Sequence, residues 1–242
     1  MNEATCISID KVSQSFRKKE VLQGITLQVK ESEIFGVLGP SGAGKTTLIK
    51  MIAGIDEAAS GSINVLGTKM PNLNVMKEIG YMAQSDALYT ELSAKENLEF
   101  FASIYGLKGE KRKQRIQSVM ELVNLTDDLN KPVQNYSGGM KRRLSLAAAL
   151  LHEPKMLILD EPTVGIDPVL RKSIWDEFVH LSQNGTTIIV TTHVMDEADK
   201  CERLAMLREG KLIATGSPNE LKAETTSTTL EEAFLFFGGV HQ

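Results

Sequence analysis

Eight residues near the N-terminus place the strongest limit on how this 242-residue chain can fold. The run 39–46 reads Gly-Pro-Ser-Gly-Ala-Gly-Lys-Thr, which matches the pattern G-x-x-x-x-G-K-[ST]. The apolar run 34–38 before it is typical of a buried strand, and the residues from Thr47 onward can continue as a helix. A strand, a glycine-rich loop and a helix are the context that this phosphate-binding pattern needs. The sequence therefore predicts an α/β nucleotide-binding core.

The loop is expected to hold a polyphosphate. Its glycines let the backbone curl so that several N–H groups point at one anion, at the positive end of a helix. Lys45 would reach the β- and γ-phosphates, and the hydroxyl of Thr46 would ligate Mg²⁺. The residues expected to contact the nucleotide here are Gly39, Pro40, Ser41, Gly42, Ala43, Gly44, Lys45, Thr46 and Thr47.

Composition narrows the class of protein. A hydrophobic fraction of 42% supports a substantial core, and a net charge of −4 argues against a surface built mainly for nucleic acid. The two cysteines, Cys6 and Cys201, are far apart and are expected to be buried or incidental thiols. The N-terminus lacks a signal-peptide pattern, and no apolar stretch approaches the ~18 residues needed to span a bilayer. We expect a soluble chain, with any membrane part supplied by another polypeptide.

Hydrophobic periodicity predicts the organisation of the chain. Apolar residues alternate with polar ones in the first segment, as in half-buried strands, whereas residues 94–152 show helical spacing. Buried-strand patterns return at 156–160 and 187–190. The predicted fold is a mainly parallel sheet core with an N-terminal antiparallel β lobe and an inserted helical subdomain at about 94–152. The domain is expected to span residues 1–222, and residues 223–242 to form a linker and a short amphipathic segment.

The strand pattern at 156–160 ends in two carboxylates, Asp160 and Glu161. A buried strand should deliver them to the same sheet edge as the glycine loop, where α/β folds bind ligands. Asp160 would hold Mg²⁺ through its water shell, and Glu161 would orient or deprotonate an attacking water. An acidic helix cap is the alternative interpretation, and the glycine loop in the same chain favours the catalytic one.

A second glycine motif, formed by Ser137, Gly138 and Gly139, precedes a predicted helix at 141–152. Ser137 is a suitable N-cap, and the glycines expose backbone N–H groups, so the motif predicts another anion site. A plain helix start is the alternative. Because the first loop already supplies a phosphate cradle, a second one is most simply explained if it closes over a nucleotide held by another subunit.

Together these motifs resemble those of the ATP-binding subunit of an ABC transporter. That family is marked by a P-loop, a glutamine loop, a signature near Leu-Ser-Gly-Gly-Gln, a strand carboxylate followed by Glu, a D-loop and a switch histidine. All occur here in that order over about residues 5–220. Outside the P-loop the matching residues are Gln84, Ser137, Gly138, Gly139, Asp160, Glu161, Asp167 and His193. Phe16 stands where the family usually has an aromatic residue that stacks on adenine.

The resemblance implies the P-loop fold of the ABC ATPases, with ATP and Mg²⁺ as ligands. It assigns catalytic roles to Lys45, Gln84, Glu161 and His193, and it adds Gln84 to Thr46 and Asp160 as a magnesium ligand. Two copies would sandwich two ATP molecules, each between one P-loop and the Ser137–Gly139 motif of the other copy. A separate multi-span permease would dock near Gln84 and residues 85–92, which places the subunit at the cytoplasmic face of the cell membrane.

The signature departs from the family pattern because it begins with Tyr136 and ends with Met140. Its Met-Lys-Arg-Arg continuation, and the tail around 230–234, resemble the drug-resistance exporter branch, so export is the expected direction. Two alternatives remain open from the sequence. One is a soluble ABC ATPase of the iron–sulfur assembly type, whose single cassette is similar. The other is a mechanotransmission ATPase that drives a periplasmic machine.

Overall fold

The computed structural model describes residues 4–17, 19–85 and 87–239. The two ends of the chain, residues 1–3 and 240–242, lie outside the described residues, so the outer limits of the predicted domain and tail do too. The same holds for Asp86, within the predicted docking segment 85–92.

The first part of the chain forms an antiparallel sheet in the strand order β2-β1-β4-β5. Its strands are β1 (Thr5–Phe16), β2 (Lys19–Lys30), β4 (Ser60–Val65) and β5 (Thr68–Lys69). Ile9 of β1 pairs with Leu27 of β2 on one side and with Ile63 of β4 on the other. All three side chains are buried, because residues directly opposite one another on paired strands point to the same face of the sheet. The predicted β lobe is confirmed.

The second sheet is mainly parallel and has the strand order β10-β9-β3-β8-β7-β6. Its members are β3 (Ile34–Leu38), β6 (Ile79–Met82), β7 (Met156–Asp160), β8 (Thr187–Thr192), β9 (Arg203–Arg208) and β10 (Lys211–Gly216). The β9–β10 pair is antiparallel, and the other pairs are parallel. Leu38 lies opposite Thr192, and Asp160 lies opposite Thr191, so β3, β8 and β7 end at the same edge.

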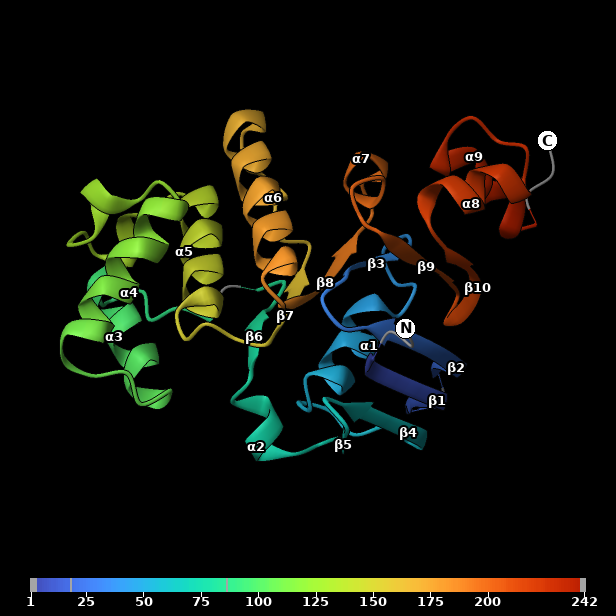
Figure 1. Cartoon of the computed structure of the whole chain (residues 1–242), viewed down its shortest axis with the longest axis horizontal. Helices are drawn as coiled ribbons and strands as arrows, with labels where there is room; N and C mark the ends of the chain where they lie inside the picture. The colour runs from blue at the N-terminus through green and yellow to red at the C-terminus, as the bar shows by residue number, and fades with distance from the viewer. Residues whose placement is uncertain (1–3, 18, 86, 240–242) are drawn as a thin grey trace.

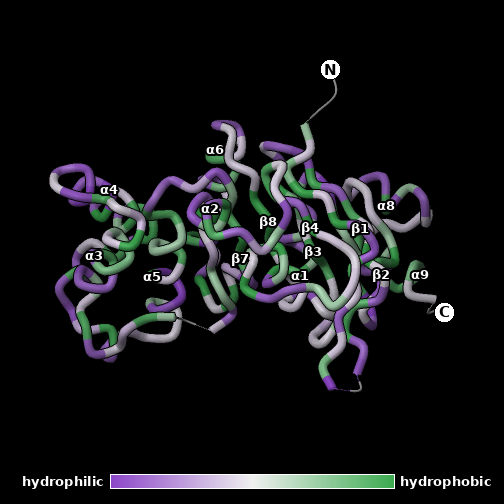
Figure 2. The backbone as a smooth tube through the Cα atoms, turned by 90° about the horizontal axis from the view of Figure 1, so that it is seen from below, coloured by the Kyte–Doolittle hydropathy of each residue, from purple (hydrophilic) through white to green (hydrophobic). Residues whose placement is uncertain are grey.

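Both faces of this sheet are covered, which explains why its strands read as continuous apolar runs. Leu157 and Leu159 of β7 belong to a cluster shared with the helices, whereas Met156 and Ile158 belong to a cluster shared with the antiparallel sheet. Figure 2 shows hydrophobic residues concentrated along the central strands and polar residues along the outer loops.

The helical subdomain lies on one side of the parallel sheet, at the left of Figure 1. It contains α3 (Ala94–Ile104), α4 (Gly109–Leu122), the short 3₁₀ turns Thr126–Asp128 and Val133–Asn135, and α5 (Gly138–Leu150). Beside it, α6 (Pro168–Gln183) packs on the sheet through Trp175 and Phe178, which are buried. A four-residue helix, α2 (Leu73–Met76), precedes β6.

In the last part of the chain, α8 and α9 lie at the sheet end that carries β9 and β10, whereas α7 packs against β3 and β8 (Figure 1). It contains α7 (Met195–Ala198), α8 (Pro218–Glu224) and α9 (Leu230–Phe237). Leu230 and Ala233 of α9 are buried, and Arg208 Nη1 donates a 2.7 Å hydrogen bond to the carbonyl of Gly238. Among the described residues, no helix is both long and apolar enough to cross a membrane.

Candidate active site

The glycine-rich loop joins β3 to α1 (Lys45–Ile52) at the shared strand edge. Gly44 is the residue before the helix and has a φ of +105°, a left-handed conformation that favours glycine. A Cβ at this position would lie 2.7 Å from Leu22 Cδ2 and 2.8 Å from the carbonyl oxygen of Val21, so a side chain is excluded by contact as well. Because Gly44 has no side chain to cap α1, the first N–H groups of the helix are available to an anion.

Lys45 is buried at the start of α1, and its ammonium group faces its own loop. Its Nζ donates hydrogen bonds to the carbonyls of Gly39 at 2.7 Å and Pro40 at 3.2 Å. The same nitrogen lies 3.7 Å from Glu161 Oε1. Burial lowers the pKa of Lys45 from its ordinary value, and the charges of Glu161 and Asp160 oppose that shift.

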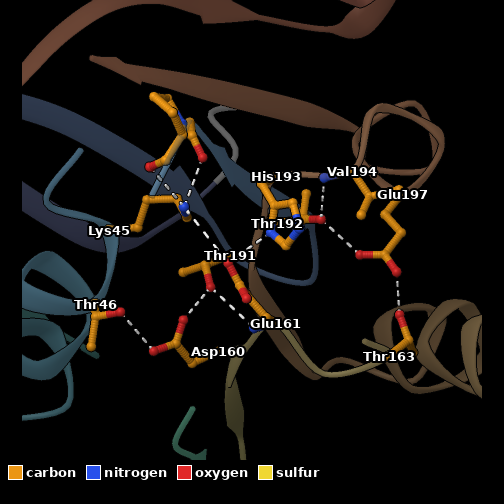
Figure 3. Close-up of polar contacts among 12 residues, drawn as sticks. Lys45, Thr46, Asp160, Glu161, Thr163, Thr191, Thr192, His193, Val194 and Glu197 are labelled. Atoms are coloured by element: carbon orange, nitrogen blue, oxygen red, sulfur yellow. Dashed lines mark hydrogen bonds and ion pairs between the residues drawn. The ribbon is translucent and has the colours of Figure 1, made fainter. Parts of the chain in front are cut away.

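Asp160 links the glycine loop to the central strand. Its side chain is almost completely buried, with 1% exposed. One oxygen, Oδ2, accepts a 2.9 Å hydrogen bond from the hydroxyl of Thr46, and Oδ1 accepts one from the hydroxyl of Thr191. Figure 3 shows these groups, from α1, β7 and β8, pointing toward one another.

Glu161 follows directly and has a φ of +52°, which is uncommon for a residue other than glycine. Such backbone conformations cost on the order of 1–3 kcal/mol and persist where neighbours hold them, often at functional sites. The N–H of Glu161 bonds to Thr191, and its Oε1 lies 2.9 Å from Nδ1 of His193. The Glu161 side chain is 13% exposed and that of His193 is 46% exposed, so this pair lies where the site opens to solvent.

Glu197 braces this region and was not anticipated from the sequence. It lies on α7, its side chain is 1% exposed, and its carboxylate accepts hydrogen bonds from the hydroxyls of Thr192, at 2.7 Å, and Thr163. Thr192 precedes His193, and Thr163 follows Glu161 by two residues, so one buried carboxylate ties the two catalytic candidates' backbones together (Figure 3). An acidic residue in the first turn of a helix is normally exposed to solvent, so the burial of Glu197 was not expected. The nearby hydroxyls of Thr191 and Thr192 were the only sign in the sequence that a buried carboxylate could be hydrogen-bonded here.

Four further candidate residues are not bonded into this cluster through their side chains, among the residues that the structure describes. Ser137 is the N-cap of α5 and accepts from the N–H of Met140 at 3.2 Å, while Asp167 caps α6. The side chain of Gln84 is exposed, and Phe16 is 50% exposed. In the part of the chain that the structure describes, no hydrogen bond or ion pair joins these four side chains to the glycine loop.

Comparison with known proteins identifies the family. The family model described as "ABC transporter" matches residues 22–164. The chain is 38% identical over 238 residues to the "Probable multidrug ABC transporter ATP-binding protein YbhF" of Escherichia coli, covering 96% of this chain and 41% of that protein. It is also 38% identical over 240 residues to the "Linearmycin resistance ATP-binding protein LnrL" of Bacillus subtilis, covering 95% of this chain and 77% of that protein.

A solved structure of an ATP-binding cassette, described as a dimer in a post-hydrolysis state bound to ADP and Pi, superposes with a TM-score of 0.82 at 25% identity. The match covers 87% of this chain and 98% of that one. The chain belongs to the ABC transporter family, and the predicted α/β P-loop fold is confirmed. It spans less than half the length of YbhF.

Removing the Glu197 carboxylate should destabilise the fold. Glu197→Ala leaves two buried hydroxyls without their acceptor, and each unsatisfied buried polar group costs about 1–3 kcal/mol. Asp196→Ala, at the exposed neighbouring position, is the matched control. Urea denaturation should show a loss of about 2–5 kcal/mol for Glu197→Ala and about 0.5 kcal/mol or less for the control. Equal stability of the two variants would contradict the bracing role.

Proposed function

We propose that this chain is the ATP-binding and ATP-hydrolysing subunit of an ABC exporter. The observation that carries the proposal is the convergence of Lys45, Thr46, Asp160, Glu161 and His193 at one edge of the parallel sheet. These residues come from three separate segments. Together they supply the groups that phosphoryl transfer needs: a cation, oxygen ligands and a base.

The polyphosphate would bind at the start of α1. The free N–H groups of its first turn and of the glycine loop would contact the phosphate oxygens. The ammonium group of Lys45 would exchange its bonds to the Gly39 and Pro40 carbonyls for bonds to phosphate, with little movement of the side chain. Binding would thus use a cation that the fold already holds in place.

Magnesium fits the oxygen atoms at the inner end of the site. The Thr46 hydroxyl and the Asp160 carboxylate are 2.9 Å apart, and Mg²⁺ prefers oxygen ligands, taking few from the protein and the rest from water and phosphates. We assign Thr46 and Asp160, with Gln84, to hold it. When bound, the ion would neutralise charge on the transferred phosphoryl group.

Glu161 is proposed as the group that orients and deprotonates the attacking water. Its carboxylate lies between the ammonium of Lys45 and the imidazole of His193, which fixes its position beside the expected γ-phosphate. Phosphoryl transfer depends mainly on positioning and charge, so a fixed carboxylate at this point is what the reaction requires.

A second copy of the chain is proposed to complete the site. Ser137 and Gly138 at the start of α5 are exposed, as are Asp167 and Phe16, so these residues are accessible to a nucleotide or to a partner surface. The relative solved as a post-hydrolysis dimer supports this arrangement. Each ATP would lie between the loop of one copy and the Ser137–Gly139 motif of the other.

The permease is proposed to dock beside the glutamine loop. A cavity of about 90 Å³ lies there, lined by side chains from the loop after β6, from α3 and from α5, including Ala83, Ser85, Ala87, Leu88, Phe101 and Tyr105. Two exposed aromatic residues, Tyr89 and Phe100, pack edge to face with their ring centroids 4.9 Å apart, and Phe100 also contacts the ring of Phe101, which lines the cavity. This placement would hold the subunit at the cytoplasmic face of the membrane.

Export is proposed because relatives carry the words multidrug and linearmycin resistance in their names. Those names favour a transporter subunit over the soluble iron–sulfur assembly type that the sequence left open. The transported compound would be selected by the permease.

The assigned role of Glu161 predicts a separation of binding from turnover. Glu161→Gln keeps the shape of the side chain but cannot accept the proton, and general-base help is worth about 10²–10⁴-fold. In steady-state ATPase assays this variant should turn over at least about a hundredfold slower than the wild type while binding a fluorescent ATP analogue normally. Lys45→Ala should lose analogue binding. Near-normal hydrolysis by Glu161→Gln, or unchanged binding by Lys45→Ala, would contradict the respective role.

If the permease docks at this cavity, a charged substitution of a residue that lines it should abolish permease binding. Ala87 is exposed at the cavity, and Ala87→Glu would place a charge where an apolar segment is expected to sit. A pull-down of the tagged chain from detergent-solubilised native membranes should recover a stoichiometric multi-span protein, and Ala87→Glu should lose it. Leu73→Glu, at an exposed position on α2, should retain it. Recovery of a soluble partner alone would overturn the transporter assignment.

A further inference from the structure

Arg142 occupies a place that the assigned motifs do not explain. It lies on α5, one turn beyond Ser137, and its side chain is 8% exposed. Its Nη1 donates to the carbonyls of Ala83, at 2.7 Å, and Gln84, at 2.9 Å. Its Nη2 donates to the carbonyls of Glu161, at 2.7 Å, and Asp160. One guanidinium therefore holds main-chain carbonyls of two segments that follow two neighbouring strands, β6 and β7.

The chemistry of the side chain makes this a fixed link. The guanidinium group is planar, always charged and carries five N–H donors in a rigid fork, so it sets both the separation and the orientation of the carbonyls that it binds. A lysine ammonium is a single point with rotatable donors and cannot bridge the same four oxygens in one geometry. The two segments are thus tied together by one residue of α5.

The link reaches the backbone of Glu161 directly. That residue has a left-handed φ of +52°, and its N–H is held by Thr191 on one side. The bond from Arg142 to its carbonyl holds the other side. Because the direction of the Glu161 side chain follows from this backbone conformation, Arg142 contributes to placing the carboxylate against Lys45 and His193.

We propose that Arg142 is a positioning residue for ATP hydrolysis. It fixes the backbone of Glu161 to the main chain of Gln84 and to the helix that begins at the Ser137–Gly139 motif. The orientation of the Glu161 carboxylate then depends on the positions of α5 and of the segment after β6. Displacement of either one would move the carboxylate out of place. This inference rests on the proposed ATP hydrolysis and adds a residue that acts on Glu161 through main-chain carbonyls.

Arg142→Lys tests the link, with Arg143→Lys as the matched control. Arg143 is the next residue of the same helix, and its Nη1 donates to the carbonyls of Val123 and Asn124, both at 3.0 Å, at the end of α4. Its bonds stay within the helical subdomain. Both substitutions keep the positive charge and remove one guanidinium group. Only Arg142→Lys removes hydrogen bonds from the main chain of Glu161.

The readouts are the melting temperature, the dissociation constant of a fluorescent ATP analogue, and kcat and KM for ATP, with kcat expressed per analogue-binding site. A small misplacement of a catalytic group can cost up to about a hundredfold in rate. Arg142→Lys should lower kcat about tenfold or more, with KM and the dissociation constant within about threefold of wild type. Arg143→Lys should leave kcat, KM and the dissociation constant within about threefold of their wild-type values.

Several results would overturn the proposal. A kcat of Arg142→Lys within about twofold of wild type, or an equal loss in Arg143→Lys, would show that the link does not position Glu161. Arg142→Gln serves as a second variant, and failure of both Arg142 variants to bind the analogue would give Arg142 a purely structural role. A wild-type chain that does not hydrolyse ATP would instead contradict the proposed function.

Discussion

The parallel register of β3, β8 and β7 is the constraint on which the site depends. Because Leu38 is level with Thr192 and Thr191 is level with Asp160, three strands end at one edge, and everything that follows them is brought together there. The hydrogen bond between Thr46 and Asp160 joins residues 114 positions apart in the chain. Core packing on both faces of the sheet fixes that register, so the chemistry at the edge rests on the apolar residues beneath it.

The burial of the site's polar residues decreases from the interior of the protein to its surface. Asp160, Glu197 and Lys45 are buried among hydroxyls and carbonyls, Glu161 is partly covered, and His193 faces solvent. The buried groups are held in a single arrangement by paired polar contacts, as buried polar groups must be. The outer groups remain accessible, as do the start of α5 and Phe16. Such an arrangement suits the proposed site, in which one chain would hold the metal and a second copy would supply the outer wall.

Sequence reasoning succeeded where local patterns carry the information. The fold class, the β lobe and the family are confirmed, because alternation, helical spacing and the glycine loop are local signals. The assigned roles of the site residues stay predictions, although the structure places Lys45, Thr46, Asp160, Glu161 and His193 together. Arg142 was missed because the carbonyls that it binds are 18 to 59 positions away in the chain, and Glu197 was missed because one of its two partners, Thr163, is 34 positions away. The run 140–143 was interpreted only through its resemblance to the exporter branch. Helical spacing, which puts Arg142 on a face with the buried Ser145, Leu146 and Ala149, was the signal that could have found it.

The effect of magnesium on nucleotide binding tests most directly whether a nucleotide site is built at this edge of the sheet. Calorimetric titration with a non-hydrolysable ATP analogue would compare Mg²⁺ with EDTA for the wild type, Asp160→Asn and Asp176→Asn, an exposed control on α6. Mg²⁺ should strengthen binding to the wild type and the control, and Asp160→Asn should lose this gain while keeping its binding in EDTA. A gain that survives in Asp160→Asn, or no binding of the analogue by the wild type, would contradict a nucleotide site built on the edge that Thr46 and Asp160 share.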